Sequence, residues 1–409
     1  MILDILFIHP NHLGQFGRLA KKLSQDKNNS IYAIAEAKHV KKEIENITTY
    51  TYKNIEDASE EVHRYNRSMQ KALIRAEQVN SMLIEKKREG FEPDIIFVHP
   101  GWGDAFYLKE IFPLTPVVGF FEYYYHARGK DVGFDPEFPM FFDDIFRLKA
   151  LNAIHLLALE SCDVRISPTQ WQKELFPKAY QESIEVIHEG IDTAKIKPDS
   201  QADLHLGDGT TLSTKDEVLT YVSRSLEPYR GYHQFMRALP KILKARPNCH
   251  VVIVGNDDVS YGKKAPDGKS YRDIYFDAIK QDVDTSRVHF TGVLEYEKYL
   301  KVIQISTCHI YLTYPFVLSW SVLEALSAGC VIVASSTDPV KEVITDGVNG
   351  LLVDFFGTDE LSQKVIDVLS RPKEYEHISK NAREFVEKNY DFENVSLKTY
   401  MKLIDKLTY

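Results

Sequence analysis

Short apolar runs alternate with longer amphipathic stretches through the first half of the chain. The runs are Ile5 to Ile8, Ile31 to Ala35, Ile95 to Val98, Val117 to Phe120, Val164 to Ser167 and Ile184 to Ile187. Two longer stretches between them, Ile55 to Arg88 and Phe141 to Ser161, have apolar residues at the spacing that is typical of helices. This order predicts strands and helices that alternate around a parallel sheet.

The same rhythm starts again after residue 216. The second set of runs is Val218 to Val222, Val251 to Val254, Val288 to Phe290, Ile310 to Thr313, Val331 to Ala334 and Leu351 to Val353. A run that is apolar throughout predicts a strand that helices cover on both faces. The segment Lys195 to Asp216, which separates the two sets, has no regular period and contains Pro198, Gly207 and Gly209. We therefore predict the domain linker there.

Length and periodicity together predict an α/β protein with two similar domains, each built on a mostly parallel sheet. A chain of 409 residues fits this number, because single domains most often hold roughly 100 to 150 residues. We place the first domain at residues 1–200 and the second at 201–388. A last segment, 389–409, holds the helical stretch Leu397 to Lys406, which no strand follows.

Charge and cysteine content exclude several classes of protein. A formal net charge of −9 argues against nucleic-acid binding. The cysteines lie far apart without a C-x-x-C pair, which indicates reduced thiols in place of disulfides or a zinc site. The N-terminal residues lack a signal-peptide pattern, and no apolar run approaches the ~20 residues that span a bilayer. We expect a cytoplasmic protein.

Peripheral contact with the inner membrane surface stays open. Several lysines of the first domain could meet an anionic membrane or a lipid-linked acceptor, although lysines on solvated helix faces are the commoner case: Lys21, Lys22, Lys38, Lys41 and Lys42.

Polar loops follow three predicted strands of the first half. In doubly wound sheets, ligands bind beyond the carboxyl ends of the strands. The first loop, His9 to Gly17, contains a glycine turn that would let backbone approach a phosphate or an acceptor. The second is His99 to Asp104, and the third, Phe121 to Asp131, is dense in polar and aromatic residues, including Glu122 and His126. Such composition favours a functional role for these loops.

In the second half, the segment Thr313 to Gly329 has the pattern of a strand end, a loop and the start of a helix. The first turn of a helix offers unpaired N–H groups and the positive end of the helix dipole, which suit a phosphate. Glu324 could accept hydrogen bonds from sugar hydroxyls, or it could close a capping box with Ser321. Arg224 and Arg230 could clamp a diphosphate, or they could be solvated arginines.

The ordered motifs resemble those of the retaining GT-B glycosyltransferases of the GT4 family. They comprise the first glycine turn, Ser167-Pro-Thr-Gln-Trp, His188-Glu-Gly-Ile-Asp192, Ser223-Arg with Tyr229-Arg-Gly231, Phe290-Thr-Gly292 and Leu323-Glu-Ala-Leu-Ser-Ala-Gly329. The resemblance runs nearly end to end. It implies a GT-B fold, with two Rossmann-like domains facing across a cleft, the nucleotide sugar on the C-terminal one and the acceptor on the N-terminal one. It also implies that the last helix crosses back to the first domain.

The resemblance also implies roles for individual residues. Arg224 and Arg230 would hold the donor diphosphate and the developing charge of the leaving group, and Glu324 would bind the ribose hydroxyls. His126 is the candidate for the active-site histidine, and Glu122 competes with it for a catalytic role. The other candidates for donor binding are Gly14, Gly255, Asn256, Gly292, Val293, Leu318, Ser319, Trp320 and Ser321.

One position departs from the family pattern. The E-x7-E motif expects its first glutamate where this chain has Phe316, and that glutamate usually touches the donor sugar. The identity of the sugar, and the effect of Phe316 on activity, are therefore open.

The resemblance implies a hexosyltransferase-type enzyme that retains the configuration of the transferred sugar and needs neither a metal nor another cofactor. The donor would be a nucleoside-diphosphate sugar, with a UDP-sugar favoured, and the acceptor a hydroxyl of a glycan, a lipid-linked molecule or a protein. The departing phosphate would help to deprotonate the incoming hydroxyl. Asp282 and Asp284 spell the D-x-D of metal-dependent transferases, but they precede a predicted strand instead of ending one.

Other functions are compatible with the same fold, because fold does not fix function. One alternative is a nucleotide-sugar epimerase or a phosphorylase, although no pyridoxal phosphate lysine site is identified. Another is a non-catalytic homologue that binds a partner transferase, which Phe316 would favour. An NAD-dependent oxidoreductase is disfavoured because neither half shows G-x-G-x-x-G after its first strand.

Overall fold

The computed structural model describes residues 3–408, and the chain forms two compact units. The first unit holds the residues up to Gly190 together with the segment from Phe392, and the second runs from Ile191 to Asp391. The chain thus enters the second unit before the predicted boundary at residue 200. Met1, Ile2 and Tyr409, which the predicted domains include, lie outside the described residues.

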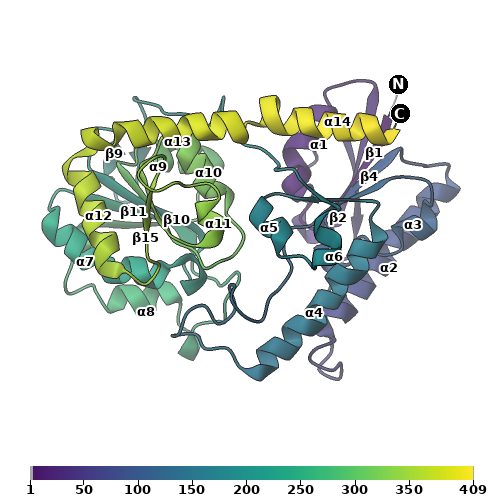
Figure 1. Ribbon diagram of the computed structural model, residues 1–409, viewed down its shortest axis with the longest axis horizontal. Helices are drawn as coiled ribbons and strands as arrows, with labels where there is room; N and C mark the ends of the chain where they lie inside the picture. Colours follow the sequence, from purple (N-terminus) through teal and green to yellow (C-terminus); the bar gives the residue numbers. More distant parts are fainter. Residues whose placement is uncertain (1–2, 409) are drawn as a thin grey trace. The chain divides into compact units, whose positions relative to one another are not determined.

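A seven-stranded sheet forms the centre of the first unit (Figure 1). Its strands are β1 (Leu3–Ile8), β2 (Asn29–Glu36), β3 (Ile47–Tyr52), β4 (Ile95–Val98), β5 (Val117–Phe120), β6 (Val164–Ser167) and β7 (Ile184–Val186). They lie in the order β3-β2-β1-β4-β5-β6-β7, and all pairs are parallel. The order reverses between β1 and β4, which is where ligands bind in open sheets of this kind.

The helices of the first unit surround this sheet. They are α1 (Gly17–Leu23), α2 (Arg67–Arg88), α3 (Leu108–Ile111), α4 (Phe142–Ser161), α5 (Gln170–Glu174), α6 (Lys178–Gln181) and α14 (Leu397–Thr408). In α2 the buried residues include Ala72, Ala76, Val79 and Leu83, whose spacing places them on one face. The prediction that this helix begins at Ile55 is wrong. Helix α2 begins at Arg67. Ile55 lies before it, with a buried side chain and an N–H that donates to the Glu36 carboxylate at the end of β2 (2.8 Å).

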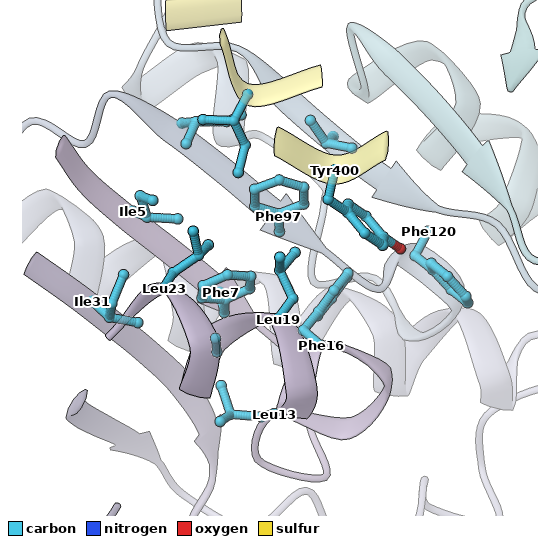
Figure 2. Close-up of a cluster of buried hydrophobic side chains, with 14 of the residues drawn as sticks. Ile5, Phe7, Leu13, Phe16, Leu19, Leu23, Ile31, Phe97, Phe120 and Tyr400 are labelled. Atoms are coloured by element: carbon cyan, nitrogen blue, oxygen red, sulfur yellow. The ribbon is translucent and has the colours of Figure 1, made fainter. Parts of the chain in front are cut away.

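The core of the first unit includes its last helix (Figure 2). Phe7 of β1 and Phe97 of β4 stack with their ring centroids 5.2 Å apart, and Tyr400 of α14 packs edge-on against Phe97 at 6.2 Å. Leu403 and Ile404 of the same helix are also buried. Burying these two side chains contributes roughly 1.5 to 3 kcal/mol each, so α14 is bound firmly to this unit.

The second unit is built on a six-stranded parallel sheet (Figure 1). Its strands are β10 (Val218–Ser225), β11 (His250–Asn256), β12 (Val288–Gly292), β13 (Cys308–Tyr311), β14 (Ile332–Ser335) and β15 (Leu351–Val353). They lie in the order β12-β11-β10-β13-β14-β15. The order reverses between β10 and β13, which are direct neighbours, and the loops after these two strands therefore lie together.

The helices of the second unit connect these strands. They are α7 (Tyr232–Ala245), α8 (Tyr271–Asp277), α9 (Tyr296–Gln304), α10 (Trp320–Ser327), α11 (Asp338–Lys341), α12 (Thr358–Ser370) and α13 (Glu376–Asn389). From Val322 to Ser327 every residue of α10 is buried, and its apolar members pack with Ile332 and Ala334 of β14. The two doubly wound parallel sheets confirm the predicted fold class.

Two segments form strands that the sequence analysis missed. Within the expected linker, β8 (Asp203–His205) and β9 (Thr211–Ser213) pair as an antiparallel hairpin. Leu204 and Leu212 anchor it in a small core, and these single apolar residues escaped a search for longer runs. Strand β3 was missed for a similar reason: its sequence alternates Thr with Tyr, and only its end residues, Ile47 and Tyr52, are buried.

Within residues 3–408, no helix combines the length and the apolar character that a membrane span requires.

Candidate functional site

Arg230 lies buried beside the carboxyl end of the second sheet, with a relative exposure of 5%. Its Nη1 donates to Thr313 Oγ1 (2.9 Å) and to the Val317 carbonyl (3.0 Å). Both acceptors belong to the loop that joins β13 to α10. Burial lowers the pKa of Arg230, but the phenols of Tyr311 and Tyr261 outweigh it and the pKa stays above its ordinary value. Arg230 therefore braces this loop as a permanent cation.

An aromatic group surrounds the same guanidinium. Arg230 Cζ lies 5.2 Å from the ring centroid of Tyr261 and 5.8 Å from that of Phe316, and these two rings pack 4.9 Å apart. Tyr229 lies edge-on against Phe316 at 5.5 Å. Phe316, which stands where the family pattern expects a glutamate, thus contributes a cation–π contact and no hydrogen-bond acceptor.

Arg224 differs from Arg230 in its surroundings. It lies near the end of β10 and its side chain is exposed. Gly255 follows the neighbouring strand, and a Cβ there would lie 2.9 Å from the Ser223 carbonyl oxygen, so only glycine allows this close approach. Asn256 accepts a hydrogen bond from Ser225 Oγ (2.9 Å) with its side chain, which ties the two strand ends together.

Helix α10 begins after Ser319, its N-cap residue, so Ser321 is already the second residue of the helix. The capping box between Ser321 and Glu324 is therefore wrong. The amides of Trp320 and Ser321 lie in the first turn, where helical N–H groups lack intrahelical acceptors. The Tyr311 hydroxyl accepts a hydrogen bond from the Ser319 N–H (3.0 Å), which ties the start of the helix to the end of β13.

Glu324 accepts hydrogen bonds from two tyrosines of α9. Its Oε1 lies 2.9 Å from the Tyr296 hydroxyl, and its Oε2 lies 2.8 Å from the Tyr299 hydroxyl. Glu324 is 4% exposed, and burial together with this carboxylate raises the pKa of Tyr299 well above its ordinary value. Both phenols are therefore donors, and Glu324 is an acceptor for neutral hydroxyl groups.

Other donor-binding candidates are accessible in the second unit. Gly292 has a φ of +64°, which turns the chain at the end of β12, and the next side chain, Val293, is 74% exposed. Trp320 is 41% exposed, and Leu318 is half-buried in the loop before α10. These residues could meet a base or a sugar without a change in the buried core.

The first unit contains a second polar cluster, at the carboxyl ends of β1, β4 and β5. His9 Nε2 lies 2.8 Å from Gln15 Oε1, and Gln15 Nε2 donates to Glu122 Oε1 (3.1 Å). Glu122 Oε2 lies 3.5 Å from His99 Nε2. The Glu122 side chain is 33% exposed while that of His99 is 5% exposed, so Glu122 is the accessible member.

The backbone fixes the tautomers of both histidines. His9 Nδ1 accepts from the Asn11 N–H (2.9 Å), and His99 Nδ1 accepts from the Gly101 N–H (3.4 Å). Each ring then carries its proton on Nε2, which points at Gln15 or toward Glu122. Burial and the neighbouring His99 lower the pKa of His9 well below its ordinary range, so His9 is neutral. The cluster therefore presents Gln15 Nε2 and His99 Nε2 to the Glu122 carboxylate, which orients that side chain.

Gly14 supports this cluster through its lack of a side chain. Its φ is +47°, and a Cβ at this position would lie 2.3 Å from His9 Nε2. Gly14 therefore packs against the His9 ring.

His126 takes a different position on the loop after β5. It is half-buried, and its Nε2 lies 2.7 Å from the Leu175 carbonyl oxygen, to which it donates. The same part of the unit holds Glu122, since Gln172 Nε2 donates to the Glu122 carbonyl (2.6 Å). The structure thus brings Glu122, but not His126, into hydrogen-bond contact with the cluster of His9, Gln15 and His99.

The sequence analysis missed His9, His99 and Gln15 as members of one site. A signal was present, because the same His-Pro pair follows two apolar runs, at Ile8-His9-Pro10 and Val98-His99-Pro100. Since β1 and β4 are neighbours and Ile8 is paired with Val98, equal positions after the two strands lie side by side.

Two family models match the chain. Residues 27–196 match the Glycosyl transferase family 4 group, and residues 208–385 match the Glycosyl transferases group 1. A curated relative, an uncharacterised glycosyltransferase of Methanocaldococcus jannaschii, is 26% identical over 231 residues, which cover 55% of this chain and 53% of that protein. The chain therefore spans about half the length of this relative.

Solved structures resemble the chain over almost all of its length. The Anabaena protein HepE, in complex with UDP and glucose, has a TM-score of 0.65 at 18% identity and covers 98% of this chain and 100% of its own. Sucrose-phosphate synthase from Thermosynechococcus elongatus has a TM-score of 0.72 at 16% identity, and the match covers 99% of this chain and 100% of that protein. At such identities the likeness shows the fold.

Proposed function

The chain belongs to the glycosyltransferase group 1 family, and on this premise we propose that it moves a sugar from a nucleoside-diphosphate sugar to a hydroxyl of an acceptor. The observation that carries the proposal is the arrangement of the second unit around α10. There a braced loop leads into a helix N-terminus, and one turn later Glu324 already accepts hydrogen bonds from two hydroxyl groups. A nucleotide sugar carries a diphosphate, which suits the helix N-terminus, and ribose hydroxyls, which suit Glu324.

We assign the donor to the second unit. The amides from Leu318 to Ser321 and the exposed Arg224 would bind the diphosphate, while Arg230 would position the loop and stabilise the charge of the leaving group. Glu324 would bind the ribose hydroxyls. The Anabaena neighbour HepE was solved with UDP and with UDP-glucose, which supports a UDP-sugar as the donor here.

We assign the acceptor to the first unit. Glu122, oriented by Gln15 and His99, would accept a hydrogen bond from the reacting hydroxyl of the acceptor or from a neighbouring one. His126, on the same loop, would donate a hydrogen bond to a sugar hydroxyl. In the proposed retaining step, the bond from the anomeric carbon to the phosphate oxygen breaks and the acceptor oxygen bonds to the same face of that carbon. The acceptor proton passes to the departing phosphate. The proposed step uses the charge of the arginines and of the helix N-terminus and assigns no role to a metal ion.

A screen of donors tests the proposal. Hydrolysis and thermal shift would be measured with UDP-, GDP-, ADP- and CMP-sugars, and we expect one class to raise the melting temperature and release its nucleoside phosphate. A Glu324→Gln variant serves as the control and should lose most of that response. If no donor is hydrolysed, or if the products are epimerised nucleotide sugars, the transferase proposal is wrong.

The nature of the acceptor is the next question for the same assay. A glycan, a lipid-linked molecule or a protein would each supply the hydroxyl, and the last two can be compared by adding membranes or purified protein to the active donor. The location in the cytoplasm, with contact to the inner membrane surface, stays a prediction.

A further inference from the structure

Glu324 is covered in the structure. At 4% exposure, its carboxylate can meet a ligand hydroxyl only after a neighbouring group moves. Of the two phenols that donate to it, Tyr299 is 9% exposed and Tyr296 is 39% exposed. Tyr296 is therefore the partner that a hydroxyl arriving from solvent would replace.

Tyr299 lies in the core of the second unit, whereas Tyr296 lies at its surface. Tyr299 belongs to the apolar core of the second unit, together with Leu300 and Ile303 of its own helix. Tyr296 is the first residue of α9, and the chain just before it contains Gly292, with a φ of +64°. The Tyr296 ring contacts that of Tyr299 at a centroid distance of 5.8 Å, but it lies at the surface, so its displacement exposes less apolar surface than a displacement of Tyr299 would.

A lysine lies over the ring of Tyr296. Lys195 Nζ is 4.9 Å from the ring centroid, and the same ammonium group pairs with Glu297 Oε1 at 2.6 Å. Lys195 thus contacts two consecutive residues at the start of α9, Tyr296 and Glu297. The contact favours the position in which the phenol bonds to Glu324.

We propose that the Tyr296 hydroxyl and a ribose hydroxyl of the nucleotide compete for the same place at the Glu324 carboxylate. The inference rests on the proposed function, since it requires Glu324 to bind the ribose. Phenol and ribose hydroxyls are both neutral donors to a carboxylate. Because Glu324 is 4% exposed, a ribose hydroxyl would reach its carboxylate by taking the place of Tyr296, the more exposed of the two phenols.

Tyr296 then acts as a gate that weakens nucleotide binding. A nucleotide with ribose hydroxyls bonds to Glu324 only in molecules in which the phenol has moved, so its apparent dissociation constant exceeds the intrinsic one by the reciprocal of the open fraction. The gate is specific for the ribose: a nucleotide without the 2′ and 3′ hydroxyls gains nothing when the gate opens.

Calorimetric titration with two nucleotides tests the gate. UDP and 2′,3′-dideoxy-UDP would be titrated into the wild type and into Tyr296→Phe, which keeps the ring and removes the hydrogen bond. We expect the variant to bind UDP about three- to tenfold more tightly, from the loss of one competing hydrogen bond, and to bind the dideoxy analogue with unchanged affinity. Equal tightening for both nucleotides, or weaker UDP binding, would overturn the gate.

Tyr299→Phe is the matched control. Its hydroxyl is buried and orients Glu324 in both states, so its loss should weaken UDP binding and lower the melting temperature. If UDP, GDP and ADP all fail to bind the wild type, the proposed function is refuted and the gate falls with it. If UDP binds and its affinity is the same in Tyr296→Phe, the gate alone is refuted.

Discussion

Replacing Arg230 by alanine should unfold the second unit at a lower temperature as well as weaken donor binding. In the structure, Nη1 of this buried side chain donates at 2.9 Å and 3.0 Å to two acceptors of the loop after β13. Thr313 is fully buried, and Val317 is 8% exposed, so water cannot replace the lost donor without opening the loop. We therefore expect Arg230 to stabilise the loop after β13 and, by holding that loop in place, to support donor binding.

The size of the effect follows from these bonds. A hydrogen bond from a charged donor contributes about 1.5 to 3 kcal/mol, so two of them amount to about 3 to 6 kcal/mol. The third contact, to the Tyr311 hydroxyl at 3.4 Å, is long and adds little. In a unit of this size, each kcal/mol changes the melting temperature by about 2 to 4 °C, which gives a decrease of roughly 6 to 24 °C.

Arg224→Ala is the matched control, since it removes an exposed arginine from the end of β10, in the same unit. Exposed substitutions usually change stability by less than about 0.5 kcal/mol, so its melting temperature should stay within about 2 °C of the wild type. Calorimetric scans of both variants, with donor turnover measured in parallel, separate the two roles. If Arg230→Ala melts like the wild type but has lost turnover, Arg230 does not stabilise the loop and instead contacts the ligand directly.

Two further predictions concern catalysis and pH. His126→Ala should keep its melting temperature within a few degrees and lose most transfer activity, and Glu122→Gln should lower kcat by at least about tenfold; full activity in His126→Ala would leave Glu122 as the catalytic group. Burial lowers the pKa of His155 and of His309 to about 4. Since these histidines bind protons more readily when unfolded, stability should be complete above about pH 6.5 and fall as the pH drops toward 4, by up to about 3 kcal/mol for each group. Urea unfolding at a series of pH values measures this, and a flat profile would contradict it.

The architecture was predictable because continuous apolar runs determine buried parallel strands. Val251 to Val254 and Val331 to Ala334 both lie in the second sheet, as expected, and the GT-B fold is confirmed. Strands that bury only single residues carry a weaker signal, which explains why the hairpin anchored by Leu204 and Leu212 was assigned to a linker.

The candidate site could be located from the sequence, but its internal contacts could not. The spacing of Arg224 and Arg230 does not reveal that one is exposed and the other buried, because burial depends on the loop after β13. Glu324 was recognised as a hydroxyl acceptor, yet its partners come from a helix that precedes it by a strand and two loops. Such contacts follow from packing and leave no local pattern.

The most direct test of the account is a titration of UDP, monitored by calorimetry, into the wild type and into Glu324→Gln. Gln retains the shape of the side chain but loses the charge that attracts the ribose hydroxyls. We predict that UDP binds the wild type and that the variant binds it at least about tenfold more weakly, as expected for hydrogen bonds to a charged acceptor. Equal affinities for the two proteins, at matching melting temperatures, would contradict the assignment of the nucleotide to α10.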